Sequence, residues 1–247
     1  MSSGGFILQS GDNQFHVDPG IGALSKAGEY GVNVRATTAI LVSHAHLNHS
    51  NDANAVIDAM SYSGLDKKGV MIANKTSIMG TDDYSPVVSP YFRGLLERFI
   101  VVDRQQRIGV NDVEIRAITA RHSEPNSLGF KFFAPEFTLT YSGDTVYSED
   151  IVEQYKDSNI LVLNVPSRKR TESNLCMEDA TKIIDSVKPN LAIITHFGQE
   201  MVKEDPMYEV REIQRQTKVQ AIAARDGMAI NPTSYSLSGQ KTLQKFK

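Results

Sequence analysis

The sequence predicts an α/β fold in which two sheets carry helices on their outer faces. Short apolar runs bounded by turn residues open the chain, and such runs indicate strands. Later apolar runs alternate with stretches in which apolar residues recur every three or four positions, a pattern typical of helices. This order, strands first and then strand–helix alternation, occurs in both halves of the 247 residues.

The first half supplies four strands and two helices. Strands are predicted over residues 5–9, 14–17, 38–43 and 70–73. One apolar face, spaced as i, i+3, i+4 and i+7, predicts a helix with Ser50 as its N-cap, and it is formed by Ala53, Val56, Ile57 and Met60. A second short helix is expected over 91–99.

The second half alternates more regularly. Strands return over 108–142 and again at 160–163, 191–194 and 219–223. Helices are expected between them at 149–156, at 177–187 and from Pro206 onward, with Ser148 as the N-cap of the first. We expect residues 1–232 to form a single domain and residues 233–247 to form a polar C-terminal tail.

Composition narrows the class of protein. Hydrophobic residues make up 40% and charged residues 22%, as in ordinary globular domains. The net charge of −3 gives no overall basic field for nucleic acid, so a nucleic-acid partner remains an alternative without support from charge. The single cysteine, Cys176, excludes an internal disulfide and suits a reducing compartment. With no signal peptide and no apolar run of ~20 residues, we expect a cytoplasmic protein without a membrane partner.

A histidine cluster follows the strand 38–43. His44, His46 and His49 lie within six residues, between that strand and the predicted helix. An extended backbone points His44 and His46 the same way because they are two residues apart. Three imidazoles in such a loop indicate a metal site rather than three unrelated side chains.

Three further residues with ligand chemistry follow strands: His122, Asp144 and His196. Imidazole and carboxylate ligands suit zinc, iron or manganese, and zinc is favoured where nitrogen dominates. Each histidine taken alone is more simply a satisfied polar residue. His16 is interpreted as structural and Cys176 as a packing residue. Asp18 is most simply part of a turn, with support of the metal ligands as the alternative.

Six residues resemble, in their order, the motif of the metallo-β-lactamase-fold hydrolases: His-x-His-x-Asp-His, then a His, an Asp and a final His. They are His44, His46, His49, His122, Asp144 and His196. The resemblance covers nearly the whole chain and implies a four-layer αβ/βα sandwich with a two-metal site. It implies that one metal is held by His44, His46 and His122, and a second by His49 and His196, with Asp144 bridging the two. Some lactamases have cysteine at the position of Asp144. An aspartate there resembles the ribonuclease Z, phosphodiesterase, lactonase and glyoxalase II members of the superfamily.

Asn48 departs from the motif because the family has aspartate at this position. We still expect Asn48 to be a metal ligand through its amide oxygen, which is a weaker ligand than a carboxylate, and its amide cannot accept a proton. The loss of one negative charge weakens the second metal site. Three explanations remain open: one tight and one weak metal, a binding relative with little catalysis, or a substitution introduced to trap substrate.

The expected chemistry is attack by a metal-activated water or hydroxide on a phosphoryl or carbonyl centre, with Asn48, Asp144 and His196 as catalytic residues. A phosphodiester substrate ranks first, and acyl hydrolysis of a lactone, thioester or β-lactam second. Candidate substrate contacts are Ser123, Ser127, Arg168 and Arg170, with a solvated loop as the equal alternative for the arginines. The segment 61–105 is expected to form either a lid or the surface of a homodimer.

Overall fold

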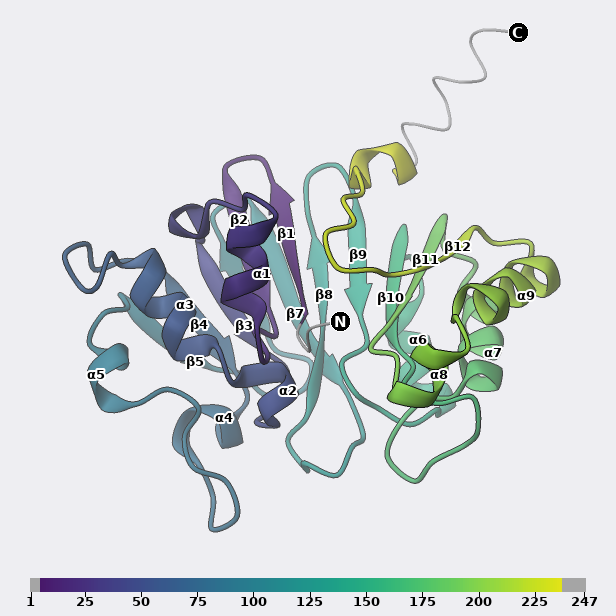
Figure 1. Ribbon diagram of the computed structural model, residues 1–247, viewed down its shortest axis with the longest axis horizontal. Coiled ribbons are helices and arrows are strands. Elements are labelled where there is room, and N and C mark those ends of the chain that lie inside the picture. The colour runs from purple at the N-terminus through teal and green to yellow at the C-terminus, as the bar shows by residue number, and fades with distance from the viewer. Residues whose placement is uncertain (1–4, 237–247) are drawn as a thin grey trace, which may run out of the picture. The chain divides into compact units, whose positions relative to one another are not determined.

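The computed structural model describes residues 5–236. Their contacts group into two compact units, and the boundary along the chain lies between Arg104 and Gln105. We call them the N-terminal and the C-terminal unit, and Figure 1 shows a sheet with helices in each. The predicted α/β class, with two sheets and flanking helices, is confirmed. The expectation of a single domain over 1–232 stays a prediction.

The N-terminal unit contains a five-stranded sheet in the order β1-β2-β3-β4-β5. Its strands are β1 (Phe6–Ser10), β2 (Asn13–Val17), β3 (Ala39–Val42), β4 (Val70–Ala73) and β5 (Arg98–Val101). β1 and β2 are antiparallel, and β2 to β5 run parallel. The helices are α1 (Ala23–Glu29), α2 (Leu47–Ser50), α3 (Ala53–Met60), α4 (Lys75–Met79) and α5 (Pro90–Arg93), with a 3-10 turn, Val34–Ala36.

The core of this unit forms between α3 and the centre of the sheet. Val56, Ile57 and Met60 are fully buried against Ile40 and Met71 in one apolar cluster. Adjacent residues of a strand point to opposite faces, and β3 is buried on both of them. This burial explains why β3 has four apolar residues in a row rather than an alternating pattern.

Two predicted helices of the N-terminal unit differ from the structure. The chain forms a single turn, α2, before α3, so Asp52 rather than Ser50 is the N-cap residue of α3. Ser50 lies in α2, and its hydroxyl donates to the carbonyl oxygens of Ala45 and His46. The prediction of a helix over 91–99 was wrong because the helix α5 ends at Arg93 and residues from Arg98 pair with β4 as a strand.

The C-terminal unit contains a seven-stranded sheet in the order β12-β11-β10-β9-β8-β7-β6. Its strands are β6 (Arg107–Val110), β7 (Val113–Thr119), β8 (Leu128–Phe133), β9 (Thr138–Tyr141), β10 (Ile160–Asn164), β11 (Leu191–Thr195) and β12 (Ala221–Ala223). Its helices are α6 (Glu149–Tyr155), α7 (Met177–Val187), α8 (Gln199–Lys203) and α9 (Met207–Thr217), followed by a 3-10 turn, Pro232–Tyr235.

The helices of the C-terminal unit follow the sequence prediction closely. α7 has the predicted bounds, and Ile183 and Ile184 are buried in the same cluster as Leu161 and Ile194 of the sheet. Residues 233–236, expected in the tail, belong to the folded unit, since Asn190 donates to the carbonyl oxygen of Tyr235 at 2.5 Å. The rest of the predicted tail, 237–247, lies outside the described residues.

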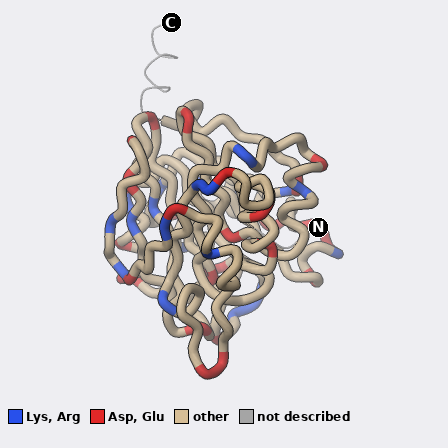
Figure 2. Tube along the Cα trace, turned by 90° about the vertical axis from the view of Figure 1, so that its left-hand side faces the viewer, with Lys and Arg blue, Asp and Glu red and all other residues tan. Residues whose placement is uncertain are grey.

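Charged residues of both signs are interspersed along the chain (Figure 2). The loop between α4 and α5 contains Asp82 and Asp83. Between residues 5 and 236, no helix has the length and apolar character needed to cross a membrane.

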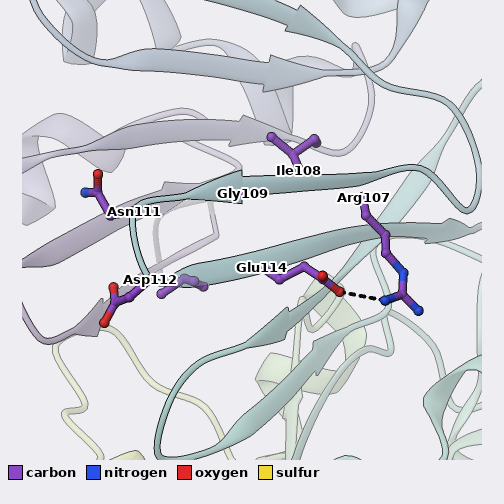
Figure 3. Close-up of a pocket in the computed structure, with 7 residues that line it drawn as sticks. Arg107, Ile108, Gly109, Asn111, Asp112 and Glu114 are labelled. Atoms are coloured by element: carbon purple, nitrogen blue, oxygen red, sulfur yellow. Dashed lines mark hydrogen bonds and ion pairs between the residues drawn. The ribbon is translucent and has the colours of Figure 1, made fainter.

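The hairpin formed by β6 and β7 lines an open pocket of about 330 Å³ (Figure 3). Arg107 and Glu114, which line it, form an ion pair with each other at 3.0 Å. The lining residues include none of the predicted site residues, so this pocket is separate from the predicted metal ligands.

Candidate metal centre

The parallel strands of the N-terminal unit end in polar residues that bind one another. Asp18, Ser43 and Asn74 directly follow β2, β3 and β4. The backbone N–H and the hydroxyl of Ser43 donate to the two carboxylate oxygens of Asp18 at 2.7 and 2.6 Å. The side-chain amide of Asn74 donates to the carbonyl oxygen of Ser43 at 3.2 Å. These bonds hold the segment from which the histidine cluster begins.

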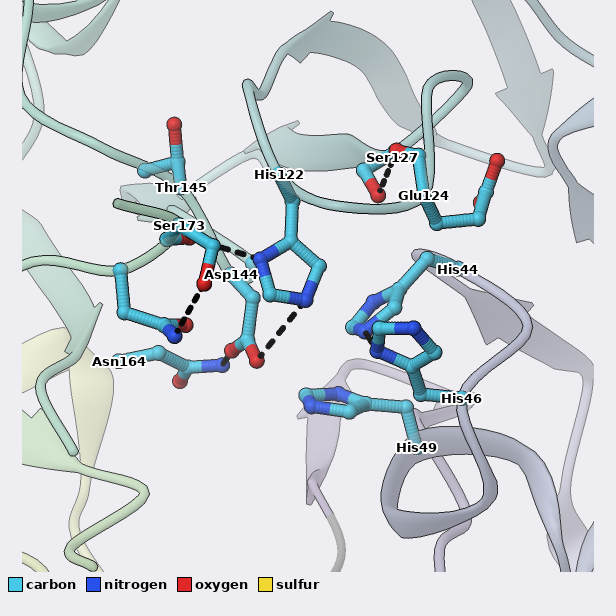
Figure 4. A network of polar contacts seen from close by, with 12 residues as sticks. His44, His46, His49, His122, Glu124, Ser127, Asp144, Thr145, Asn164 and Ser173 are labelled. Atoms are coloured by element: carbon cyan, nitrogen blue, oxygen red, sulfur yellow. Dashed lines mark hydrogen bonds and ion pairs between the residues drawn. The ribbon is translucent and has the colours of Figure 1, made fainter. Parts of the chain in front are cut away.

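His44 and His46 bring two ring nitrogens together. Nε2 of His44 lies 3.0 Å from Nδ1 of His46, and the two rings, drawn in Figure 4, are nearly perpendicular at 78°. Two nitrogens bound to one zinc at ~2.0–2.1 Å, in tetrahedral geometry, would lie about 3.3 Å apart. The pair therefore already has nearly the separation that a shared metal ion requires.

The single turn of α2 adds His49 to this pair. His46 is the extended N-cap residue of α2, and the N–H of His49 donates to its carbonyl oxygen at 2.9 Å. The ring centroids of His44 and His49 lie 4.1 Å apart, and a ring nitrogen of each lies within 4.8 Å of one of the other. The three histidines predicted as ligands in this unit are thus brought together.

Hydrogen bonds on the outer ring nitrogens fix which nitrogen can bind a metal. The buried carboxylate of Asp18 accepts a hydrogen bond from Nδ1 of His49 at 2.8 Å, and a neutral His49 ring then has its lone pair on Nε2. The hydroxyl of Ser43 donates its hydrogen to Asp18, so it accepts one from Nδ1 of His44 at 3.0 Å. His44 likewise carries its lone pair on Nε2. Such partners are typical of metal-ligating histidines.

Asn48 is half-buried on α2, between His46 and His49 in sequence. Its position on a one-turn helix fits the place of the family aspartate, whereas its neutral amide supplies no negative charge. Asp52, a few residues on, accepts a hydrogen bond from the backbone N–H of Leu24 at 3.1 Å. Asp52 therefore connects α1 to the start of α3.

The C-terminal unit brings together the other predicted ligands for a topological reason. β9, β10 and β11 are parallel, and β7 runs in the same direction because two antiparallel pairings separate it from β9. The carboxyl ends of these strands therefore share one edge of the sheet, and His122, Asp144 and His196 follow β7, β9 and β11.

Asp144 lies between the two histidines of this unit. Its Oδ2 is 3.8 Å from Nε2 of His122 and 3.6 Å from Nε2 of His196. The side chains of His122 and Asp144 are each 5% exposed, whereas that of His196 is 25% exposed. His196 has a φ of +61°, a left-handed conformation that is uncommon for histidine.

Two residues that the sequence analysis did not select orient these side chains. The amide of Asn164, at the end of β10, donates to Oδ1 of Asp144 at 2.7 Å. The carbonyl oxygen of Ser173 accepts a hydrogen bond from Nδ1 of His122 at 2.7 Å, which leaves the lone pair of His122 on Nε2 (Figure 4). No sequence pattern singles out either residue, because both act across a separation of at least twenty positions.

The predicted substrate serines have different surroundings. Ser123 is exposed and lines, with His122, a cavity of about 390 Å³ in the C-terminal unit. Ser127 is fully buried, and its hydroxyl donates to the carbonyl oxygen of Glu124 at 2.7 Å. Ser127 therefore shapes the loop, whereas Ser123 lies where a ligand has access.

The predicted basic contacts are engaged in ion pairs. Arg168 pairs with Glu204 and, at 2.9 Å, with Glu209. Arg170 lies 3.4 Å from Asp179 at the start of α7. Their role in binding substrate stays a prediction, and a phosphate would have to compete with these carboxylates.

Other titratable groups fit structural roles. His16 is 3% exposed, and burial lowers its pKa to about 4, an effect that the charges of Asp52 and Asp18 partly oppose. Cys176 is also buried, and burial raises the pKa of its thiol. A neutral imidazole and a protonated thiol are what packing residues require.

Comparison with known proteins identifies the family to which this arrangement of elements belongs. Residues 13–197 match a family described as the beta-lactamase superfamily domain. A protein of Methanocaldococcus jannaschii, called uncharacterized protein MJ1374, is 29% identical over 233 residues, which are 93% of this chain and 87% of that protein.

Solved structures agree in fold at low identity. The metallo-beta-lactamase fold protein YhfI from Bacillus subtilis matches with a TM-score of 0.75 and 16% identity, over 90% of this chain and 88% of that one. A structure described as a new diphosphatase from the PhnP family matches with a TM-score of 0.69 and 16% identity, over 91% of this chain and 82% of that one.

Proposed function

The chain belongs to the beta-lactamase superfamily and has the metallo-β-lactamase fold, and from this premise we propose that it is a metal-dependent phosphodiesterase. The observation that carries the proposal is the set of histidines whose outer nitrogens are held by Asp18, Ser43 and Ser173. That arrangement presents lone pairs on the inner nitrogens, which is the donor set of a zinc site.

The metal assignment follows the ligand order of the family. We assign His44, His46 and His122 to one divalent ion, His49 and His196 to a second, and Asp144 to both. Zinc fits best because five of these six ligands are imidazoles. When bound, such ions lower the pKa of a coordinated water toward ~7 and stabilise negative charge on the substrate.

The chain's own residues have separate tasks in this proposal. Asp144, fixed by Asn164, would supply a carboxylate ligand at the end of β9 that offsets part of the charge of the metal ions. Asn48 would supply a neutral amide oxygen near the second ion and could not take up a proton. His196, the most exposed of the three proposed ligands of its unit, would complete the ligand set of the second ion.

Substrate identity rests on two supports. The first is the fold shared with a protein described as a diphosphatase, in which a phosphoryl group reacts. The second is the cavity beside His122, where the hydroxyl of Ser123 can donate to a phosphoryl oxygen. The guanidinium group of Arg121, which also lines this cavity, is held by Asp150 through two bonds of 2.9 and 2.8 Å. Because Asp150 already balances the charge of Arg121, the cavity suits a phosphodiester, which carries less negative charge than a phosphomonoester.

The test combines metal analysis with a substrate panel. Purified protein is loaded with zinc, its metal content is measured, and bis-p-nitrophenyl phosphate, a lactone and nitrocefin are offered to the wild type and to Asn48→Asp. We expect bound zinc, hydrolysis of the phosphodiester, and a faster rate in Asn48→Asp because the added carboxylate strengthens the second site. The exposed Asn33→Asp serves as the matched control and should leave the rate unchanged.

Each of the other possible outcomes would assign a different function to the chain. No bound transition metal after loading overturns the proposal. Hydrolysis of only the lactone or nitrocefin replaces the phosphodiesterase with an acyl hydrolase. Zinc binding without hydrolysis by either form identifies a binding relative of the family.

A further inference from the structure

Arg121 lines the cavity beside His122, yet its guanidinium group is bound by residues at the start of α6. We infer that Asp150, by holding Arg121, weakens the binding of groups that carry two negative charges. Such a group is the phosphomonoester that hydrolysis of a phosphodiester releases. Asp150 is then a positioning residue that favours release of the product. The inference rests on the proposed function because it concerns the product of that reaction.

The backbone of Arg121 is fixed between the ends of two strands. Its N–H donates to the hydroxyl of Thr145 at 2.9 Å, and its carbonyl oxygen accepts a hydrogen bond from the N–H of Val146 at 2.9 Å. Arg121 lies just after β7, and Thr145 and Val146 lie just after β9, so these bonds join the strand ends that carry His122 and Asp144. The side chain of Arg121 therefore starts from a fixed position beside two of the proposed ligands.

Asp150 occupies the donors with which Arg121 would bind a phosphate. Nη1 and Nη2 of Arg121 donate to the two carboxylate oxygens of Asp150 at 2.9 and 2.8 Å, and Nη1 also donates to the hydroxyl of Ser148. An arginine binds a phosphate through the same two-pronged arrangement of N–H groups. Hydrogen bonds from Arg121 and Ser148 hold the pKa of Asp150 below its usual range, so this carboxylate is charged at neutral pH. A phosphate must displace it to reach the guanidinium.

A second carboxylate leaves the wall of this cavity negative. Glu172 lines the cavity and is exposed, and no cation between residues 5 and 236 forms an ion pair with it. Since Asp150 balances Arg121, the charge of Glu172 is left over. The proposed metal ions attract substrate and product alike, whereas Glu172 repels a doubly charged group more strongly than a singly charged one.

Hydrolysis of a phosphodiester converts one of these species into the other. The oxygen of water bonds to phosphorus, the bond from phosphorus to one ester oxygen breaks, and an alcohol and a phosphomonoester are released. The diester carries one negative charge, and the monoester carries nearly two above its second pKa of about 6. The arrangement of Asp150 and Arg121 therefore acts mainly on the product.

Solvent exposure limits the size of the effect. The side chains of Arg121 and Asp150 are 48% and 57% exposed, and an exposed ion pair changes an equilibrium only severalfold. The two parallel bonds strengthen the pair beyond a single contact. We therefore expect the release of Arg121 to change product affinity by about 3- to 10-fold.

The experiment compares two probes that differ in charge, in the zinc-loaded full chain. At about pH 8, methyl phosphate carries two negative charges and dimethyl phosphate carries one. Calorimetry measures the affinity for each probe, and inhibition of bis-p-nitrophenyl phosphate hydrolysis measures it independently. The proteins are the wild type, Asp150→Asn and the control Glu149→Gln, which removes an equal charge from an exposed residue of the same helical turn. Thermal unfolding confirms that each variant is folded.

We expect Asp150→Asn to bind methyl phosphate about 3- to 10-fold more tightly than the wild type, with a change of less than about twofold for dimethyl phosphate. Glu149→Gln should match the wild type for both probes. Asp150→Glu, which keeps the carboxylate, should restore the weak binding of methyl phosphate. In an Arg121→Gln background, Asp150→Asn should have no such effect because there is no guanidinium group to release.

Three results overturn the inference alone: no tighter binding of methyl phosphate in Asp150→Asn, an equal gain in Glu149→Gln, or an equal gain that persists without Arg121. If the wild type hydrolyses no phosphodiester, the proposed function fails, and the calorimetric comparison still decides the role of Asp150. If neither the wild type nor Asp150→Asn binds either probe, both the inference and the proposed function fail.

Discussion

The carboxylate of Asp18 and the imidazole of His49 are 31 residues apart in sequence and 2.8 Å apart in the structure, and both are buried. Asp18 has a φ of +48°, which turns its side chain back toward the ends of β3 and α2. The residue therefore connects the end of β2 to the proposed metal ligands of the same unit.

Replacing this carboxylate should weaken both folding and metal binding. Asp18→Asn puts an amide NH₂ against a donor, either the hydroxyl and backbone N–H of Ser43 or Nδ1–H of His49. We expect the free energy of unfolding to fall by about 1–3 kcal/mol and the zinc affinity to fall about 10- to 100-fold. Denaturant titration and chelator competition measure the two effects. Asp12→Asn, at an exposed turn, should change neither, and unchanged zinc affinity in Asp18→Asn would contradict the role given to Asp18.

Zinc should stabilise the folded protein. A ligand that binds only the folded state adds about 2.7 kcal/mol to the free energy of unfolding when its concentration is 100 times its dissociation constant. We expect the thermal midpoint to rise with zinc, to return after chelation, and to respond far less in His46→Gln. A midpoint that is independent of zinc in the wild type would argue against a metal site in the folded chain.

His16 should make stability depend on pH. Burial lowers its pKa to about 4 from an ordinary value of 6.5, so between these values the unfolded chain binds a proton and the folded chain does not. The stabilising effect is complete above pH 6.5 and is lost as the pH falls toward 4. In metal-free protein, the wild type should lose about 2 kcal/mol more than His16→Gln between pH 7.5 and 4.5. Parallel pH profiles for the two proteins would show that His16 titrates normally.

Gly198 should not tolerate a side chain. A Cβ at this position would lie 2.5 Å from the carbonyl oxygen of Pro166, which accepts a hydrogen bond from the N–H of Gly198 at 3.0 Å. Gly198→Ala must therefore displace the loop that follows His196, at a cost of about 1–3 kcal/mol in the free energy of unfolding. Gly109→Ala is the matched control because nothing lies within 4 Å of its Cβ position. Equal unfolding midpoints for the two variants would rule out this close contact.

Residues with local patterns were predictable from the sequence. The apolar runs gave β3, β10 and β11, and the periodic face gave α7 with its observed bounds. The candidate ligands could be selected because they follow predicted strands and match the family motif in order. Within the N-terminal unit His44, His46 and His49 meet as expected, and within the C-terminal unit so do His122, Asp144 and His196.

The residues that orient the ligands were beyond prediction. Tyr84 and Ser173 act on histidines 38 and 51 positions away, through a phenol and a backbone carbonyl that no periodic pattern marks. Ser50 was predicted to be the N-cap of α3 but lies in α2. A one-turn helix such as α2 is too short to leave a periodic signal in the sequence. Tertiary pairing with β4 likewise decides that residues from Arg98 are a strand rather than a helix.

The hydrogen bonds that link Asp18, Ser43 and Asn74 have a consequence for the energetics of metal capture. The imidazole side chains lose their conformational entropy when the chain folds, and hydrophobic burial offsets that loss. An arriving ion then meets donors with little remaining conformational entropy to lose, so more of the intrinsic bond strength becomes affinity. The metal-free cluster should therefore be as rigid as the strands that carry it, with slow amide hydrogen exchange from Ser43 through His49.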